Sequence, residues 1–408
     1  MTPPPPASPR VAIACGGTGG HLFPGLAVAE EFRASGCAVT LLISPKEVDQ
    51  QAVKAARHMD VATLPAVGLT RGGGLAFARG FIASYRAARR QFRASPPQAA
   101  LAMGGFTSAP PLLAARRLGA PVYLHESNAV PGRANRWLSW LVAHAFIAFP
   151  GAAASLHTAS VTVTGTPVRP QFQPRDPAAC RAALGLDPAR PVLLVMGGSQ
   201  GASPINALLL KAMPLLAARW PHWQWLHLAG LNDAQAIRRG YAHAGLTAVT
   251  HAFFDAMELA LGAATAAVSR AGGSSLAELA ALRLPSILIP YPFATDDHQL
   301  LNARALVNTG AACLLEQKTA TPEAFAAMLA ELVETPPRRA AIQAALAQWH
   351  APHAARQIAQ TMLEAIRHPQ SRNAARPSDN AKAESLIQQR ARAERGIELE
   401  TEVEIIGE

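Results

Sequence analysis

A glycine-rich turn beside a histidine is the part of this sequence best suited to chemistry. Residues 14–25 read Ala-Cys-Gly-Gly-Thr-Gly-Gly-His-Leu-Phe-Pro-Gly and directly follow the apolar run Val11–Ala14. Glycines let backbone N–H groups approach a ligand closely, and the positive end of a following helix, expected to start near Pro24, attracts anions. The turn predicts a phosphate or diphosphate site, with His21 as a titratable group at its mouth. The alternative is a plain strand-to-helix turn.

Two further glycine-rich loops follow predicted strands. Met103–Ser108 contains the pair Gly104-Gly105, and Gly197–Ala202 follows the apolar run Val192–Met196. Successive backbone N–H groups in such turns can bind an anion. Two strand–glycine loop–helix starts, near the N-terminus and near residue 200, predict two nucleotide-binding folds that share one cleft.

Another predicted strand ends in the polar run His125-Glu126-Ser127-Asn128, with Asn135 shortly beyond. Ligands of open parallel sheets bind beyond the carboxyl ends of the strands, so these side chains are candidates for substrate contact. The spacing is not His-Glu-x-x-His, which argues against zinc. A purely structural Glu126, which only ties down loops, is the alternative.

The second half offers a carboxylate and two amides for sugar recognition. Glu278 falls in the first turn of a helix after the run Ser269–Ser275, where it can accept hydrogen bonds from both ribose hydroxyls or act as a simple capping residue. Gln299 and Asn302 are three residues apart and share a helix face, so their amides suit sugar hydroxyls. An ordinary polar helix start is the alternative for this pair.

Short apolar runs alternate with helical stretches along most of the chain, which predicts parallel sheets covered on both faces. Gly165–Pro170 interrupts the pattern and indicates a linker. We therefore expect the following division: residues 1–9, a disordered proline-rich N-terminus; 10–167, an N-terminal Rossmann-like domain; 168–350, a C-terminal Rossmann-like domain; 351–368, a helix that crosses back to the first domain; 369–408, a charged tail. The tail is expected to be disordered, with a docking or self-association strand as the alternative.

The chain carries 37 Lys and Arg against 27 Asp and Glu, a formal net charge of +10 that favours anionic partners. No nucleic-acid-binding motif is present, and the four scattered cysteines form neither a metal cluster nor a disulfide framework. Residues 71–93 contain six arginines and no acid. This stretch predicts a helix with a basic face, either simply solvated or attracted to an anionic membrane surface.

Seven segments together point to one family: GGTGGHLFPGLAVAEEF at 16–32, MGGFTSAP at 103–110, LHESNAVPGRAN at 124–135, GTPVR at 165–169, GGSQGA at 197–202, SRAGGSSLAEL at 269–279 and PYPFATDDHQLLNA at 290–303. In this order they resemble the MurG family of glycosyltransferases over about residues 10–365. The resemblance implies an α/β GT-B fold, two Rossmann-like parallel-sheet domains with a cleft between them. It also implies inverting transfer of GlcNAc from UDP-GlcNAc to the C4 hydroxyl of MurNAc in lipid I (undecaprenyl-diphospho-MurNAc-pentapeptide), giving lipid II.

The resemblance further implies peripheral attachment to the cytoplasmic face of the inner membrane. No cofactor is expected, and no metal either, because the first half contains no Asp-x-Asp pair and the helix N-termini with Arg169 could stabilise the leaving UDP instead. Cell-wall synthesis proteins are further candidate partners, and no nucleic acid is expected. The adjacent pair Asp296-Asp297 is interpreted as a helix start rather than a metal site.

Site roles carry over from the family by position. Thr18, Gly19 and Gly20 are expected to face the donor diphosphate and sugar, and Arg169 and Ser199 the phosphates. Asn128, Gln299 and Asn302 are expected to contact GlcNAc, the backbone of Phe254 the uracil, and Glu278 the ribose. For the base that deprotonates the acceptor hydroxyl, His21 is the first candidate and Glu126 the second.

Three rival functions remain open from the sequence. The nearest is another UDP-sugar enzyme of the same architecture, such as a UDP-GlcNAc 2-epimerase. The others are a nucleotide-sugar-binding protein without catalysis and a dinucleotide oxidoreductase.

Overall fold

The computed structural model describes residues 8–53, 59–65, 74–198 and 201–368. The chain divides into two compact units, residues 1–359 and 360–408, and both β-sheets lie in the first. The expectations for residues 1–7, for Ser199 and for the tail from residue 369 concern positions outside the described residues.

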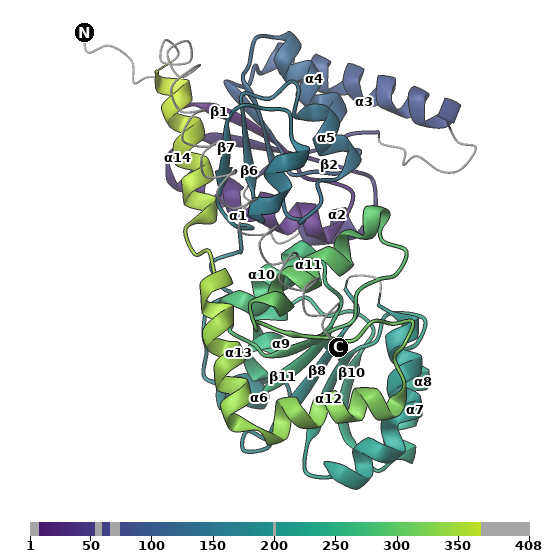
Figure 1. Ribbon diagram of the computed structural model, residues 1–408. Helices are drawn as coiled ribbons and strands as arrows, with labels where there is room; N and C mark the ends of the chain where they lie inside the picture. The colour runs from purple at the N-terminus through teal and green to yellow at the C-terminus, as the bar shows by residue number, and fades with distance from the viewer. Residues whose placement is uncertain (1–7, 54–58, 66–73, 199–200, 369–408) are drawn as a thin grey trace, which may run out of the picture. The chain divides into compact units, whose positions relative to one another are not determined.

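The first sheet contains seven parallel strands in the order β3-β2-β1-β4-β5-β6-β7. Strands β1, β2, β6 and β7 are labelled in Figure 1. Its strands are β1 (Arg10–Ala14), β2 (Ala38–Ile43), β3 (Asp60–Thr63), β4 (Ala99–Ala102), β5 (Val122–Glu126), β6 (His144–Ile147) and β7 (Val161–Val163). Its helices are α1 (Gly19–Ala34), α2 (Glu47–Ala52), α3 (Gly74–Ala94), α4 (Ala109–Arg117) and α5 (Arg133–Leu138), with the 3₁₀ helix η2 (Pro150–Ser155). The strand order reverses between β1 and β4, so the loops after these strands open a crevice at the carboxyl edge.

The second sheet repeats this plan with six parallel strands in the order β10-β9-β8-β11-β12-β13. Its strands are β8 (Val192–Met196), β9 (Gln224–Leu228), β10 (Thr247–His251), β11 (Ala266–Ser269), β12 (Ser286–Leu288) and β13 (Cys313–Leu314). Its helices are α6 (Pro177–Ala183), α7 (Ser203–Arg219), α8 (Ala234–His243), α9 (Met257–Ala263), α10 (Gly273–Ala281), η3 (Thr295–Asp297), α11 (His298–Asn308), α12 (Pro322–Glu334) and α13 (Pro336–Trp349). α14 (Ala354–Arg367) follows. The order again reverses, here between β8 and β11.

The central strands of both sheets are buried. Every residue of β4, β5, β8 and β11 is buried, as expected for strands that helices cover on both faces. The α/β fold with two Rossmann-like sheets that the sequence predicts is therefore confirmed.

One helix start differs from the sequence prediction. α1 begins at Gly19 rather than near Pro24, and Pro24 lies inside it. Proline removes only the N–H that would bond to the Gly20 carbonyl, and Thr18 is the N-cap residue. As a result Gly19, Gly20 and His21 form the first helical turn, and their position relative to the cleft is fixed by the helix.

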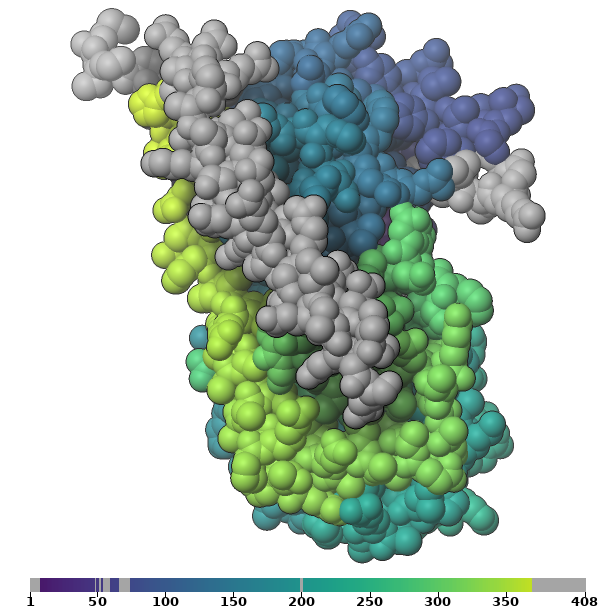
Figure 2. Space-filling model, viewed as in Figure 1, coloured from purple at the N-terminus to yellow at the C-terminus, as the bar shows by residue number. Residues whose placement is uncertain are grey.

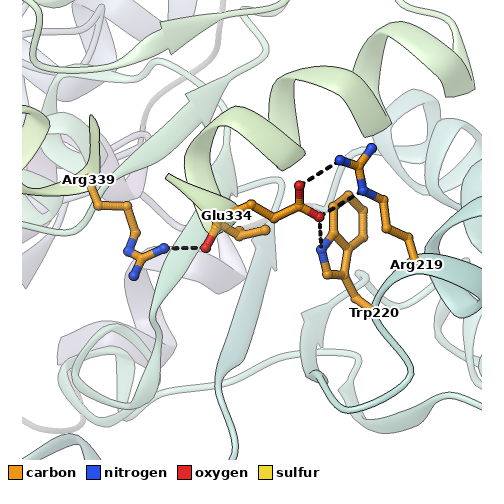
Figure 3. A network of polar contacts seen from close by, with 5 residues as sticks. Arg219, Trp220, Glu334 and Arg339 are labelled. Carbon is orange, nitrogen blue, oxygen red and sulfur yellow. Dashed lines mark hydrogen bonds and ion pairs between the residues drawn. The ribbon is translucent and has the colours of Figure 1, made fainter. Parts of the chain in front are cut away.

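The end of α12 is tied to the end of α7 by a single carboxylate (Figure 3). Glu334 accepts hydrogen bonds from Arg219 Nε at 2.7 Å and Nη2 at 2.6 Å, and from Trp220 Nε1 at 3.0 Å. Arg339 at the start of α13 donates to the neighbouring Val333 carbonyl. None of these residues lines the cleft, and the network joins α12, on the yellow-green surface of Figure 2, to α7.

α3 is the most unusual helix of the first half, because one end extends beyond the sheet (Figures 1 and 2). Ala88 and Phe92 are buried in the core, whereas Leu75 is 68% and Ile82 48% exposed. Within the described residues, no helix is both long and apolar enough to cross a bilayer.

Candidate active site

A large cleft lies at the carboxyl edges of both sheets. Its volume is about 1320 Å³, and residues of both halves line it. Nine of the sequence-predicted site residues line it: Thr18, Gly19, Gly20, His21, Asn128, Arg169, Phe254, Glu278 and Gln299. Glu126 and Asn302 are buried behind the wall instead.

The His21 imidazole lies flat against the loop after β4. A Cβ atom built on Gly104 would be 2.9 Å from His21 Cδ2, and one on Gly105 would be 3.0 Å from Cε1. Both glycines also have positive φ angles, +105° and +77°. The glycine pair that the sequence analysis interpreted as an anion loop thus provides a surface on which the histidine ring packs.

Two features of its surroundings keep His21 neutral and oriented. Its Nδ1 is 3.1 Å from the Thr18 hydroxyl, which fixes the rotation of the ring. Burial is the main effect that lowers the pKa of His21 to about 4, with further lowering from His298 and Lys46 and an opposing contribution from Asp49. At neutral pH the ring therefore has a free lone pair.

Asp49 holds the first glycine loop in place by hydrogen bonds, and sequence reasoning missed it. Its Oδ2 accepts hydrogen bonds from the Gly17 N–H at 2.7 Å and from the Ser44 hydroxyl at 2.5 Å. Lys46 Nζ donates to the Gly17 carbonyl at 3.0 Å. An isolated acid in a short helix carries no sequence signal, so only the fold reveals this role.

Glu126 is 3% exposed and its carboxylate is saturated by four donors. Oε1 accepts from the backbone and side-chain N–H groups of Asn128, and Oε2 from Gly132 N and Asn135 Nδ2, all at 2.9 Å. Each oxygen thus uses both lone pairs. This geometry holds the loop 126–132 in shape.

Arg169 and Glu278 are two of the charged residues that line the cleft. The Arg169 guanidinium packs against the rings of Phe23 and Phe172, 4.4 and 5.0 Å from their centroids. Its buried Nε has no hydrogen-bond partner among the described residues. Burial raises the pKa of Glu278 to about 7; Arg169 opposes this shift and Glu258 adds to it. Both groups are thus poised for a polar ligand.

The remaining second-half residues present an amide and an aromatic ring. Gln299 Oε1 accepts from Tyr291 N at 3.0 Å and Ala271 N at 3.3 Å, and Nε2 has no acceptor among the described residues, so it can donate into the cleft. Phe254 lines the cleft beside His251, with ring centroids 4.7 Å apart. Arg270, which sequence reasoning did not select, braces the strand end by donating to the Ile289 and Pro290 carbonyls.

Comparison with known families decides the classification. A model of the glycosyltransferase family 28 N-terminal domain matches residues 11–147, and a model of the family's C-terminal domain matches residues 192–362. The chain belongs to glycosyltransferase family 28.

Relatives of this family 28 chain align with most of its length. The UDP-N-acetylglucosamine--N-acetylmuramyl-(pentapeptide) pyrophosphoryl-undecaprenol N-acetylglucosamine transferase of Chromohalobacter salexigens is 40% identical over 368 residues, which span 86% of this chain and 96% of the relative. The crystal structure of Acinetobacter baumannii MurG matches with a TM-score of 0.68 at 27% identity and covers 87% of this chain and 99% of its own. A UDP-N-acetylglucosamine 2-epimerase structure has a TM-score of 0.64 at 13% identity, covering 88% and 96%, which shows a shared fold alone.

Proposed function

We propose that this chain is a UDP-GlcNAc-dependent N-acetylglucosaminyltransferase that converts lipid I into lipid II. The observation that carries the proposal is one cleft that is lined by His21 of the first half and by Arg169, Glu278 and Gln299 of the second. The relatives named for this reaction, 35–40% identical over most of the chain, support the choice of substrates.

The second half is suited to hold the donor. The Glu278 carboxylate would accept hydrogen bonds from the two ribose hydroxyls, and Phe254 would lie beside the uracil. Arg169 and the helix N-termini after the glycine loops would neutralise the diphosphate, which gains negative charge as UDP departs. The free Nε2 of Gln299 would donate to a GlcNAc hydroxyl.

The first half is suited to activate the acceptor. The MurNAc C4 oxygen attacks C1 of GlcNAc while the C1–O bond to UDP breaks, and the hydroxyl proton passes to His21. Nε2 must carry the lone pair, so Nδ1–H must donate to Thr18 Oγ1. We assign the base to His21 rather than Glu126, because the four hydrogen bonds of Glu126 leave it no lone pair for the acceptor.

We also propose that the exposed stripe of α3 attaches the enzyme to the inner membrane. Leu75, Arg79, Ile82 and Arg86 follow one another at helical spacing and are all exposed. The stripe thus combines apolar side chains with cations, which suits an anionic lipid surface. Phe77 and Phe81, by contrast, are half-buried and line the cleft.

Replacing both arginines, Arg79→Gln with Arg86→Gln, should weaken binding to phosphatidylglycerol-containing vesicles about 30-fold, since each cation near the surface contributes about 1 kcal/mol. Vesicle sedimentation at low and high salt measures this. Arg238→Gln with Arg239→Gln removes the same charge from exposed positions of α8 and should leave binding nearly unchanged. Equal loss in both variants would reduce the effect to net charge and reject the stripe.

The function itself is tested by UDP release from UDP-GlcNAc, with and without a short-chain lipid I analogue. Release that requires the acceptor, with a disaccharide product, is the expected result. Release without acceptor would favour hydrolysis or epimerisation, and tight donor binding with no release would favour a non-catalytic role.

A further inference from the structure

Asn302 is fully buried and uses every polar atom of its amide. It lies on α11, three residues after Gln299. Its Oδ1 accepts from the Ala129 N–H at 2.7 Å, and its Nδ2 donates to Asn128 Oδ1 and to the Ala271 carbonyl, both at 3.0 Å. No N–H of Asn302 remains for a sugar, so the expected contact with GlcNAc does not fit this arrangement.

Two of these three bonds connect the halves of the cleft. Ala129 and Asn128 follow β5 in the first half, whereas Asn302 and Ala271 belong to the second. The same loop is pressed from the other side, because a Cβ atom on Gly273 of α10 would be 2.1 Å from the Ser127 carbonyl oxygen. The ion pair of Arg136 with Asp296 is a further link, although it is exposed and contributes little.

The direction of the hydrogen-bond chain is unambiguous. At one end the Ala271 carbonyl can only accept, and at the other the Glu126 carboxylate accepts from Asn128 Nδ2 at 2.9 Å. Between these ends Asn302 must point its NH₂ at Asn128, and Asn128 must point its NH₂ at Glu126. The second N–H of Asn128 Nδ2 has no acceptor within the part of the chain that the structure describes, and Asn128 lines the cleft.

We propose that Asn302 is a positioning residue that acts through Asn128. By holding Asn128 Oδ1 from the second half, Asn302 keeps the spare Asn128 N–H aimed at the GlcNAc of the donor. Sugar recognition by the first half is then completed only when α11 is docked against it. This inference rests on the proposed function only for the identity of the sugar.

The test is a double-mutant cycle on donor binding, with affinities for UDP-GlcNAc and UDP measured by calorimetry. Asn302→Ala and Asn128→Ala should each raise the Kd for UDP-GlcNAc about tenfold, the value of one hydrogen bond, and leave the Kd for UDP unchanged. The double variant should be no worse than Asn128→Ala alone. Multiplied effects would mean that Asn302 contacts the sugar directly, and an equal loss for UDP would mean general damage; either result overturns the proposal.

Two further variants serve as controls for the double-mutant cycle. Asn308→Ala removes an exposed asparagine of the same helix and should change neither Kd. Asn302→Asp keeps the shape and the acceptor for Ala129 but cannot make both donations, so it should reproduce the loss if Asn302→Ala does not fold. These binding measurements need no turnover, so failure of the proposed transferase activity appears separately in the UDP-release assay.

Discussion

His21→Ala is expected to lower kcat by about 10²–10⁴-fold while the KM for UDP-GlcNAc changes less than about threefold. The reason is that a positioned general base contributes this much to rate and His21 belongs to the acceptor side of the proposed reaction. Initial rates of UDP release with saturating lipid I analogue measure the effect. Added imidazole should restore part of the activity, because removal of the ring leaves a space above Gly104 and Gly105.

A second substitution separates the base from the packing. His21→Asn retains a polar atom near the Thr18 hydroxyl but cannot take up a proton, so it should lose as much activity as His21→Ala. Thermal unfolding of both variants checks that the loop is intact. A wild-type kcat in either folded variant would remove His21 as the base.

Glu278→Ala should raise the KM and the Kd for UDP-GlcNAc about 100-fold or more, because two charge-assisted hydrogen bonds to ribose are lost and each contributes about 1.5–3 kcal/mol. Glu258→Gln is the matched control: Glu258 is a nearby carboxylate that does not line the cleft. It should leave the affinity above pH 8 within about threefold. An unchanged donor KM in Glu278→Ala would refute the ribose role.

The same carboxylate predicts the pH dependence of donor binding. With a pKa of about 7, Glu278 is increasingly protonated below neutrality. This proton must be lost before both carboxylate oxygens can accept hydrogen bonds from the ribose hydroxyls of UDP-GlcNAc. The Kd should therefore rise about tenfold for each pH unit below 7 and level off above it. Glu278→Gln should abolish this rise in Kd at low pH. Glu258→Gln should shift the rise to lower pH, because Glu258 raises the pKa of Glu278. His21 cannot cause the rise, since its pKa is about 4.

Folding responds to Glu278 in the opposite sense. Its pKa is raised above the usual value of 4.5, so the protonated form favours the folded state and this contribution is lost as pH rises through about 7. Glu278→Gln should therefore unfold at the same or a higher temperature than the wild type at pH 8. Weaker donor binding in that variant cannot then be explained by lost stability.

The strands were readable from the sequence because their physics is local. Val192–Met196 is apolar throughout, Val122–Glu126 and Ala266–Ser269 each begin with three apolar residues, and the structure contains strands with these bounds. Their loops collect at one edge because parallel strands end there, which is why most of the predicted site residues line one cleft. The start of α1 was placed too late, because Pro24 resembles a helix N-terminus although it lies within the first two turns.

The roles of buried polar groups could not be read in this way. Glu126 and Asn302 have the residue types of ligand-binding groups, but each spends its hydrogen bonds on backbone and amide partners. Those partners lie 2 to 174 residues away in sequence, so only the assembled fold determines whether a lone pair remains for substrate. The sequence likewise did not determine which face of α3 is exposed. The structure shows that Ala88 and Phe92 are buried and that Leu75 and Ile82 are exposed.

The surface beneath His21 restricts how this enzyme can evolve. Two constraints keep Gly104 and Gly105 as glycine. Their φ angles are positive, which is unfavourable for residues with a side chain, and the His21 ring occupies the space where a Cβ atom would lie. A change that removes one constraint leaves the other in place. A substitution of either glycine is therefore unfavourable as long as His21 is present. Descendants of this chain are therefore expected to keep or to lose the three residues as one inherited block, which makes the two glycines as diagnostic of the histidine's role as the histidine itself.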